Sequence, residues 1–144
     1  SQMIGEYEFE FAVVPHSGNY ESADIPRLAS LYNAPVIYKQ FLENIKTGTR
    51  PLKSEYIEVS GNNVEVTAIK KSERSEEIIV RLFNSGFETA NNSKITINFP
   101  HKSAIITNLK ENLDSGKLKS DDKPHEYLLP EIKSAGILTI KILI

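Results

Sequence analysis

Residues 56–69 read YIEVSGNNVEVTAI and give the clearest sign of how this chain folds. Residues 56–59 and 64–69 are two short runs in which β-branched and other apolar side chains alternate with Glu or Thr. Between them, residues 60–63 supply the Ser, Gly and Asn that are typical of a tight turn. The stretch therefore predicts two antiparallel strands that are joined as a hairpin.

Similar runs continue to the end of the chain. We expect strands at residues 56–59, 64–69, 78–83, 94–99, 104–109, 126–129 and 137–143. In the run 94–99, Ile95, Ile97 and Phe99 share one face, because successive side chains of a strand point to opposite faces. That face is apolar and is predicted to point inward. Short strands separated by clusters of Gly, Asn, Ser and Pro are typical of an antiparallel β-sandwich.

The beginning of the chain shows a strict alternation. Residues 6–13 read EYEFEFAV. One face would carry Tyr7, Phe9, Phe11 and Val13, and the other would carry Glu6, Glu8 and Glu10. This pattern predicts a half-buried antiparallel strand whose aromatic face belongs to the core of the sandwich. The glutamates would lie about 7 Å apart along the strand without a pocket, so we interpret them as a solvated face, not a catalytic carboxylate pair.

One helix is expected after this segment. Its apolar positions, Ile25, Leu28, Ala29 and Tyr32, have the spacing of one helical face. Ser22 or Asp24 could cap the helix, and the proline at position 35 should end it. Residues 36–38 are a candidate short strand, and residues 46–54 have the composition of a loop.

These patterns together predict a mainly all-β fold. We expect an antiparallel β-sandwich of about 8–10 strands, with one short helix near residues 22–32. A closed barrel is the alternative, and the unequal lengths of the runs disfavour it. No internal repeat or second domain is evident, so residues 1–144 are predicted to form a single domain.

Composition narrows the possible functions. The chain has 144 residues, of which 40% are hydrophobic and 25% charged, as in ordinary globular proteins. A net charge of -2 gives no electrostatic basis for binding nucleic acid or an anionic membrane, and neither is an expected partner. Cysteine is absent, so disulfides, thiolate nucleophiles and cysteine-bound metals are excluded.

No set of residues with catalytic spacing is apparent in the sequence. The three histidines, His16, His101 and His125, fall in predicted turns without a partner at metal-ligand spacing. Arg81 stands in the apolar run 78–83, where its side chain must reach the edge of the sheet or pair with a buried carboxylate. No catalytic and no metal-binding residue is predicted, and His16 and Arg81 are the candidates for an inter-domain or cleft-facing role.

Aromatic side chains leave a second functional class open. The candidates for stacking on a sugar are Tyr32, Tyr38, Phe41, Tyr56, Phe87 and Tyr127. Several of them are needed for the core of a sandwich, and exposed aromatic clusters are uncommon on monomers. Carbohydrate therefore remains a candidate partner, and a stand-alone carbohydrate-binding module or another β-sandwich interaction domain is the alternative function.

Four segments, in order, resemble one enzyme family. They are FEFAVVPHSG at residues 9–18, LYNAPV at 31–36, VEVTAIKKSE at 64–73 with IVRLFN at 79–84, and ITNLKE at 106–111, with a closing GILTI at 136–140. Their succession resembles the C-terminal β-sandwich region of family-38 glycoside hydrolases, the zinc-dependent retaining α-mannosidases, in their bacterial and cytosolic branch. Val36 replaces the usual leucine, and residues 128–132 fit the family only loosely.

The resemblance implies that the chemistry lies elsewhere. In this family the zinc ligands and the aspartate nucleophile belong to a separate α/β catalytic region, so no catalytic residue is carried over to this chain. We expect a non-catalytic C-terminal fragment of a cytoplasmic glycosidase, inactive alone, without its own cofactor while the parent enzyme uses zinc. Its expected partners are the catalytic domain of the same polypeptide and, through an exposed apolar patch, a second copy of the chain.

Overall fold

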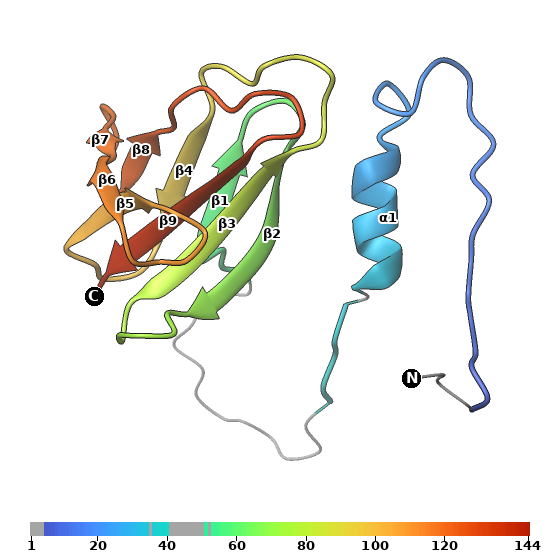
Figure 1. Ribbon diagram of the computed structural model, residues 1–144, viewed down its shortest axis with the longest axis horizontal. Helices are drawn as coiled ribbons and strands as arrows, with labels where there is room; N and C mark the ends of the chain where they lie inside the picture. The colour runs from blue at the N-terminus through green and yellow to red at the C-terminus, as the bar shows by residue number, and fades with distance from the viewer. Residues whose placement is uncertain (1–4, 35, 41–50, 52) are drawn as a thin grey trace.

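The computed structural model describes residues 5–34, 36–40, 51 and 53–144. Two antiparallel sheets pack face to face as a β-sandwich, and one helix lies beside them (Figure 1). The four-stranded sheet has the order β1 (Ile57–Ser60), β4 (Lys94–Ile97), β8 (Glu126–Leu128) and β7 (Lys119–Ser120). The five-stranded sheet has the order β2 (Val64–Lys71), β3 (Ile78–Asn84), β9 (Ile137–Leu143), β5 (Ser103–Thr107) and β6 (Asp114–Lys117). The predicted mainly-β sandwich with one short helix is confirmed.

The core lies between the two sheets and follows the period-two pattern of the strands. Its buried members are Val64, Val80, Leu82, Ala90, Ile95, Ile97, Ala104, Leu118, Leu129, Ile132, Ile140 and Ile142. Ile95 and Ile97 are fully buried and Phe99 packs against the core, as the alternation in the run 94–99 predicts. Transfer of such side chains out of water is the main contribution to the stability of the sandwich.

The outer face of the five-stranded sheet is also covered. Ile79 alternates with the core residues Val80 and Leu82, and yet it is fully buried. Thr107 and Thr139, which pair across β5 and β9, are 5% and 3% exposed. The loop between β5 and β6 supplies part of this cover, since the Thr107 hydroxyl donates to the Leu113 carbonyl oxygen at 3.1 Å.

The predicted hairpin at residues 56–69 is wrong in its pairing, although both strands exist. β1 pairs with β4 in one sheet, and β2 pairs with β3 in the other. The turn between them therefore carries the chain from one sheet to the next. Gly61 has φ 141° and Asn63 has φ 60°, and a Cβ on Gly61 would collide with Ser93, just before β4. A tight glycine turn is compatible with both arrangements, so local sequence could not tell a hairpin from a crossing between sheets.

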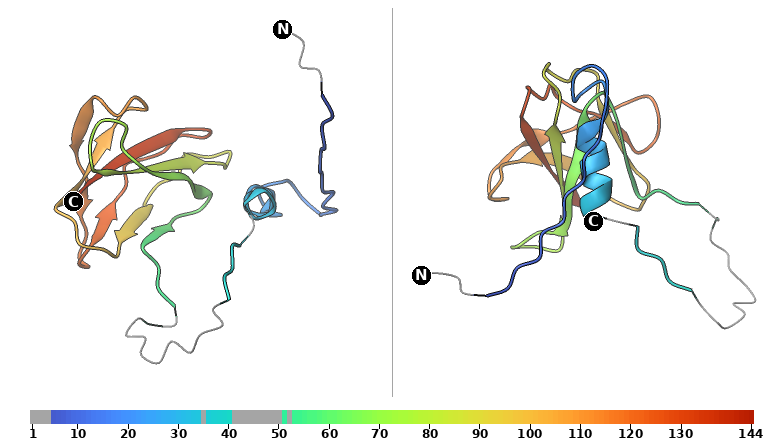
Figure 2. Two further views of the ribbon diagram at one scale, coloured as in Figure 1. Left: turned by 90° about the horizontal axis from the view of Figure 1, so that it is seen from below. Right: turned by 90° about the vertical axis from the view of Figure 1, so that its right-hand side faces the viewer.

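The predicted strand at residues 6–13 is a second correction. These residues run extended beside helix α1, on the side away from the sandwich (Figures 1 and 2). They belong to neither sheet, and Phe9 and Phe11 are 84% and 86% exposed. The aromatic face is therefore not part of this core, because both sheets are completed by later strands.

Helix α1 (Ile25–Asn33) confirms the predicted helix with slightly shifted bounds. Pro26 falls in its first turn, where a missing N–H is tolerated. The expected capping is not seen: Asp24 has φ 54° and no capping hydrogen bond, and its carboxylate pairs with Arg27. The helix buries none of its residues, and among the described residues a side-chain hydrogen bond joins it to the sheet, in which Ser30 Oγ donates to Glu65 Oε2 at 3.3 Å.

Three further sequence predictions need comment. Residues 36–38 form no strand and are highly exposed, so that candidate is wrong. Of the predicted loop 46–54, residues 46–50 and 52 lie outside the described residues, as does Phe41. β6 and β7 were not predicted, because their residues are exposed and polar and lack an apolar alternation. No helix in the described part of the chain is long and apolar enough to cross a membrane.

Candidate functional site

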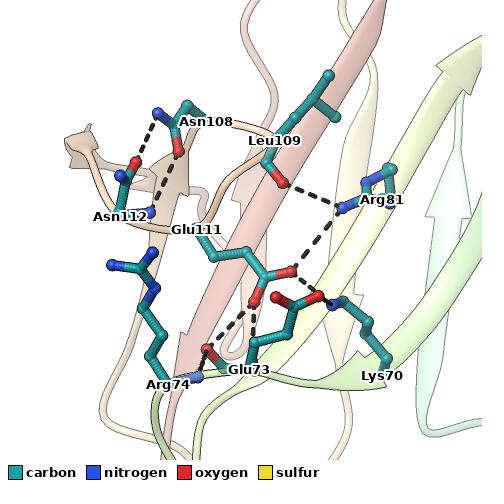
Figure 3. Close-up of polar contacts among 9 residues, drawn as sticks. Lys70, Glu73, Arg74, Arg81, Asn108, Leu109, Glu111 and Asn112 are labelled. Carbon is teal, nitrogen blue, oxygen red and sulfur yellow. Dashed lines mark hydrogen bonds and ion pairs between the residues drawn. The ribbon is translucent and has the colours of Figure 1, made fainter.

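The most connected polar cluster lies on the outer face of the five-stranded sheet. It is built around Glu111, in the loop between β5 and β6, which folds across β9 towards β2 and β3 (Figure 3). Asn108 shapes this loop: its carbonyl oxygen accepts from the Glu111 N–H at 3.0 Å, and its Oδ1 accepts from the Asn112 N–H at 3.2 Å. Glu111 adopts φ 60°, and its side chain turns inward and is 3% exposed.

The Glu111 carboxylate receives donors from β2, from the turn after β2 and from β3. Lys70 Nζ donates to Oε1 at 2.7 Å. The Glu73 backbone N–H and Ser72 Oγ donate to Oε2 at 3.0 and 3.3 Å. Arg81 Nη2 lies 3.9 Å from Oε1. Both carboxylate oxygens are thus satisfied, as a buried charge requires.

The surroundings of Glu111 keep it ionised. The Lys70 hydrogen bond, followed by the Glu73 N–H, holds the pKa of Glu111 below its ordinary value, and burial only partly opposes this. Hydrogen bonds to Glu111 and then to Glu73 raise the pKa of Lys70 above its ordinary value. A carboxylate with a lowered pKa and enclosed by donors is a poor proton donor near neutral pH, so this cluster is suited to fastening a loop, not to acid catalysis.

Arg81 pairs with a buried carboxylate, one of the two roles that its position in an apolar strand allowed. Its Nη2 lies 3.9 Å from Glu111 Oε1 and donates to the Leu109 carbonyl oxygen at 3.5 Å. Both contacts are long, and the buried Nε has no hydrogen-bond partner among the described residues. Arg81 is therefore more weakly coupled to Glu111 than Lys70 is.

A second polar cluster joins Tyr127, which lies in a predicted strand, to His101 and His125, which the sequence placed in separate turns. The Tyr127 hydroxyl donates to His101 Nε2 at 2.6 Å, and His101 Nδ1–H donates to the Phe99 carbonyl oxygen at 2.7 Å. A carbonyl can only accept, so Nδ1 carries the hydrogen of this bond, and in the neutral ring Nε2 is left to accept from the Tyr127 hydroxyl. The His125 ring centroid lies 5.3 Å from that of His101. Burial raises the pKa of Tyr127.

Three of the hollows on the described surface bear on function. A polar hollow of about 550 Å³ includes Glu21, Asn62, Asn63, Glu88 and Asn91 in its lining. An apolar groove of about 590 Å³ lies at the β1 and β2 edges of the two sheets and is lined by Tyr56, Ile57, Ile69, Ile78 and Phe99. A third hollow, of about 440 Å³, is lined by residues of helix α1 and by Glu10, Phe11, Ala12 and Val14.

Comparison with protein families identifies the sandwich. Residues 63–140 match the profile described as the glycosyl hydrolases family 38 C-terminal β-sandwich domain. The chain belongs to this family. The match covers β2 to β8 and most of β9, and therefore includes the whole Glu111 cluster and the His101 cluster. A search of curated proteins found no match.

Family membership gives the domain its setting. The family 38 C-terminal sandwich is a non-catalytic domain of α-mannosidase-family proteins, and it associates with the family's other domains. Within this domain, Glu111 belongs to the segment ITNLKE at residues 106–111, so the motif is explained by the loop that it fastens. Within the Glu111 cluster, only Arg81 was a site candidate from the sequence. Its partner carboxylate was missed because Glu111 belongs to a distant loop of the chain, after β5.

The other sequence candidate, His16, lies outside the matched stretch. Its ring is exposed in a turn, and Nδ1 lies 3.5 Å from the Ser17 carbonyl oxygen. No contact joins it to Arg81 in the described part of the chain, so the two candidates are not parts of one site. Their inter-domain role stays a prediction.

The residues of this family 38 domain do not fit a zinc ion. Among residues 5–34, 36–40, 51 and 53–144, no three His, Cys, Asp or Glu side chains lie close enough to hold a metal. His101 and His125 are neighbours without a third ligand, and both His101 nitrogens are already hydrogen-bonded. The aromatic candidates for sugar stacking are likewise spread over separate elements, from Tyr32 on α1 to Tyr127 on β8.

Proposed function

We propose that this chain is the supporting, non-catalytic C-terminal domain of a longer α-mannosidase-type hydrolase. The parent enzyme hydrolyses terminal α-mannosides by a retaining reaction in which zinc and a carboxylate nucleophile belong to a separate catalytic domain. It is of the bacterial and cytosolic type and acts in the cytoplasm. The observation that carries the proposal is the family 38 match over residues 63–140.

The charged clusters of the domain support this division of labour. Glu111 is enclosed by donors from Lys70, Ser72 and Glu73, and its lowered pKa keeps it from donating a proton at neutral pH. Lys94, on β4, pairs with Asp121, directly after β7, and with Glu126, on β8. These ion pairs fasten the β7 and β8 region to β4. Such pairs use the ionisable groups for holding loops and strands in place.

Removal of the domain from the parent hydrolase tests the proposal. We expect the truncated enzyme to keep its zinc content per molecule and to unfold at a lower temperature, because it loses the surface that the sandwich covers. An unchanged unfolding temperature would contradict the supporting role. Loss of zinc on truncation would contradict the absence of metal ligands from this domain.

Direct sugar binding is the second candidate function, and the polar hollow favours it. Its amide and carboxylate side chains, among them Asn62, Asn91 and Glu88, offer the hydrogen bonds that sugar hydroxyls need. Next to Glu88, the exposed Phe87 ring packs against Tyr20 with centroids 4.7 Å apart. Titration of the domain with methyl α-mannoside, followed by NMR, separates the two functions. The supporting role predicts no saturable shift of the Asn62 or Asn91 side-chain amides.

A further inference from the structure

Residues 6–13 are called the N-terminal segment. They have the sequence pattern of a β-strand but pair with no strand among the described residues. Four apolar side chains alternate with three glutamates. Tyr7, Phe9, Phe11 and Val13 are 50%, 84%, 86% and 79% exposed, respectively. A contiguous apolar row of this size on a soluble protein usually marks an interaction surface.

The backbone of the N-terminal segment is equally unpartnered. Within the described residues, neither sheet includes it, and no backbone hydrogen bond joins residues 6–15 to the rest of the chain. A run of free N–H and C=O groups in an extended chain is a ready template for pairing with a sheet edge. The alternation then sends the aromatic side chains to one face of that sheet and the glutamates to the other.

We propose that the N-terminal segment adds as a β-strand to an unpaired sheet edge in another domain of the hydrolase. This inference rests on the proposed function, since it names the surface by which the supporting domain is attached. The pairing supplies main-chain hydrogen bonds for affinity, and the alternate side chains supply specificity.

The two faces of the N-terminal segment define the chemistry that the accepting sheet must offer. Phe9 and Phe11 need an apolar layer under one face of the accepting sheet, because large aromatic side chains bind where they are fully desolvated. Glu6, Glu8 and Glu10 need lysine or arginine on the other face, because opposite charges on directly paired strands attract and like charges repel.

The same rule disfavours the sheet edges that this chain offers. In an antiparallel pair of two N-terminal segments that puts both aromatic rows on one face, the glutamates of both copies share the other face and repel. The free edge strand β1 carries Glu58 on its exposed face, so it repels them too. The free edge of β2 lies next to helix α1, where Ser30 bonds Glu65 (Figures 1 and 2). The other free edges, β6 and β7, carry Lys117 and Lys119, but they are four and two residues long and exposed at every position, so they offer no apolar layer for the aromatic side chains. A different domain is therefore a better occupant than an edge of this chain or a second copy.

The test is binding in trans. The 144-residue chain is titrated calorimetrically with the remainder of the hydrolase, expressed separately from the same coding sequence. We expect Phe11→Asp to weaken binding by at least about tenfold, as for a central aromatic anchor. Glu8→Lys should also weaken it. The matched control is Leu113→Asp, since Leu113 is an apolar side chain, 64% exposed, in the loop before β6. This control should bind as the unchanged chain does.

Each outcome has a defined meaning. Equal binding by the unchanged chain and Phe11→Asp would overturn the strand inference and leave the supporting role intact. No binding by the unchanged chain would overturn both. Dimerisation of the chain that Phe11→Asp abolishes would make a second copy the occupant and overturn the proposed partner. Misfolding does not confuse the result, because Phe11 is outside the core and Phe11→Asp should unfold at the same temperature as the unchanged chain.

Discussion

Lys70 Nζ lies 2.7 Å from Glu111 Oε1, and this contact joins the edge strand β2 to the loop between β5 and β6. The two residues are on opposite sides of β3 and β9 in the strand order of the sheet. The pair therefore ties the loop across the outer face of the five-stranded sheet.

Glu111→Gln is expected to destabilise the domain by about 1–3 kcal/mol, because it leaves charged and backbone donors with a weaker acceptor. Urea unfolding measures the change. The matched control is Glu76→Gln: Glu76 also pairs with a lysine, at 2.7 Å, but its side chain is 89% exposed. That exposed pair should stabilise the domain by less than about 0.5 kcal/mol. Equal effects of the two substitutions would contradict the enclosed carboxylate.

Stability should fall in acid, and Glu111 should account for part of the fall. Its pKa in the folded state is lower than the ordinary 4.5, so its contribution is complete above that value. The contribution is lost as the pH falls through the lowered folded-state pKa. Asp114, whose pKa Lys141 lowers, acts in the same direction.

Urea midpoints measured from neutral pH into acid check this sign. Glu111→Gln should show a shallower fall than the unchanged domain, and Asp114→Asn should remove a separate part of the slope. A Glu111→Gln variant that loses stability in acid as steeply as the unchanged domain would show that Glu111 has an ordinary pKa.

A double-mutant cycle should rank the two cations around Glu111. Lys70 is 2.7 Å and Arg81 is 3.9 Å from the same carboxylate oxygen. We expect the coupling free energy of Lys70→Met with Glu111→Gln to exceed that of Arg81→Met with Glu111→Gln, which should stay below about 1 kcal/mol. A larger coupling for Arg81 would reverse the assigned roles.

Tyr127→Phe tests the His101 cluster. The substitution removes the hydroxyl that donates to His101 Nε2 and should cost about 1–2 kcal/mol. Burial raises the pKa of Tyr127 above its ordinary 10.0, so its phenolate absorbance should appear at a higher pH than that of free tyrosine. Tyr56→Phe, at an exposed tyrosine, is the matched control for both the unfolding measurement and the absorbance titration. A titration in which Tyr127→Phe removes an ordinary tyrosine step would contradict the burial.

The sequence predicts the strands well where both their faces have a defined environment. β3 and β9 are long apolar runs, and their predicted bounds agree with the structure to within a residue. β6 was missed because Asp114–Lys117 is polar and exposed at every position. Residues 6–13 show the opposite failure: their alternation is strong, but the partner that would bury the aromatic face is not among the described strands.

The candidate site was predictable only in part. An arginine inside an apolar strand needs a counter-charge, and this drew attention to Arg81 from sequence alone. The identity of that counter-charge depends on how the loop before β6 folds over the sheet, and this follows from tertiary packing. Glu111 with φ 60° is an uncommon loop conformation for a non-glycine residue, which no propensity argument would have placed there.

The most direct test of the central claim is an activity assay on the purified 144-residue chain with an aryl α-mannoside and added zinc. The assignment as a non-catalytic family 38 sandwich predicts a folded protein that releases no aryl alcohol above the buffer rate and retains no zinc after dialysis. Zinc-dependent turnover that copurifies with the chain would contradict it.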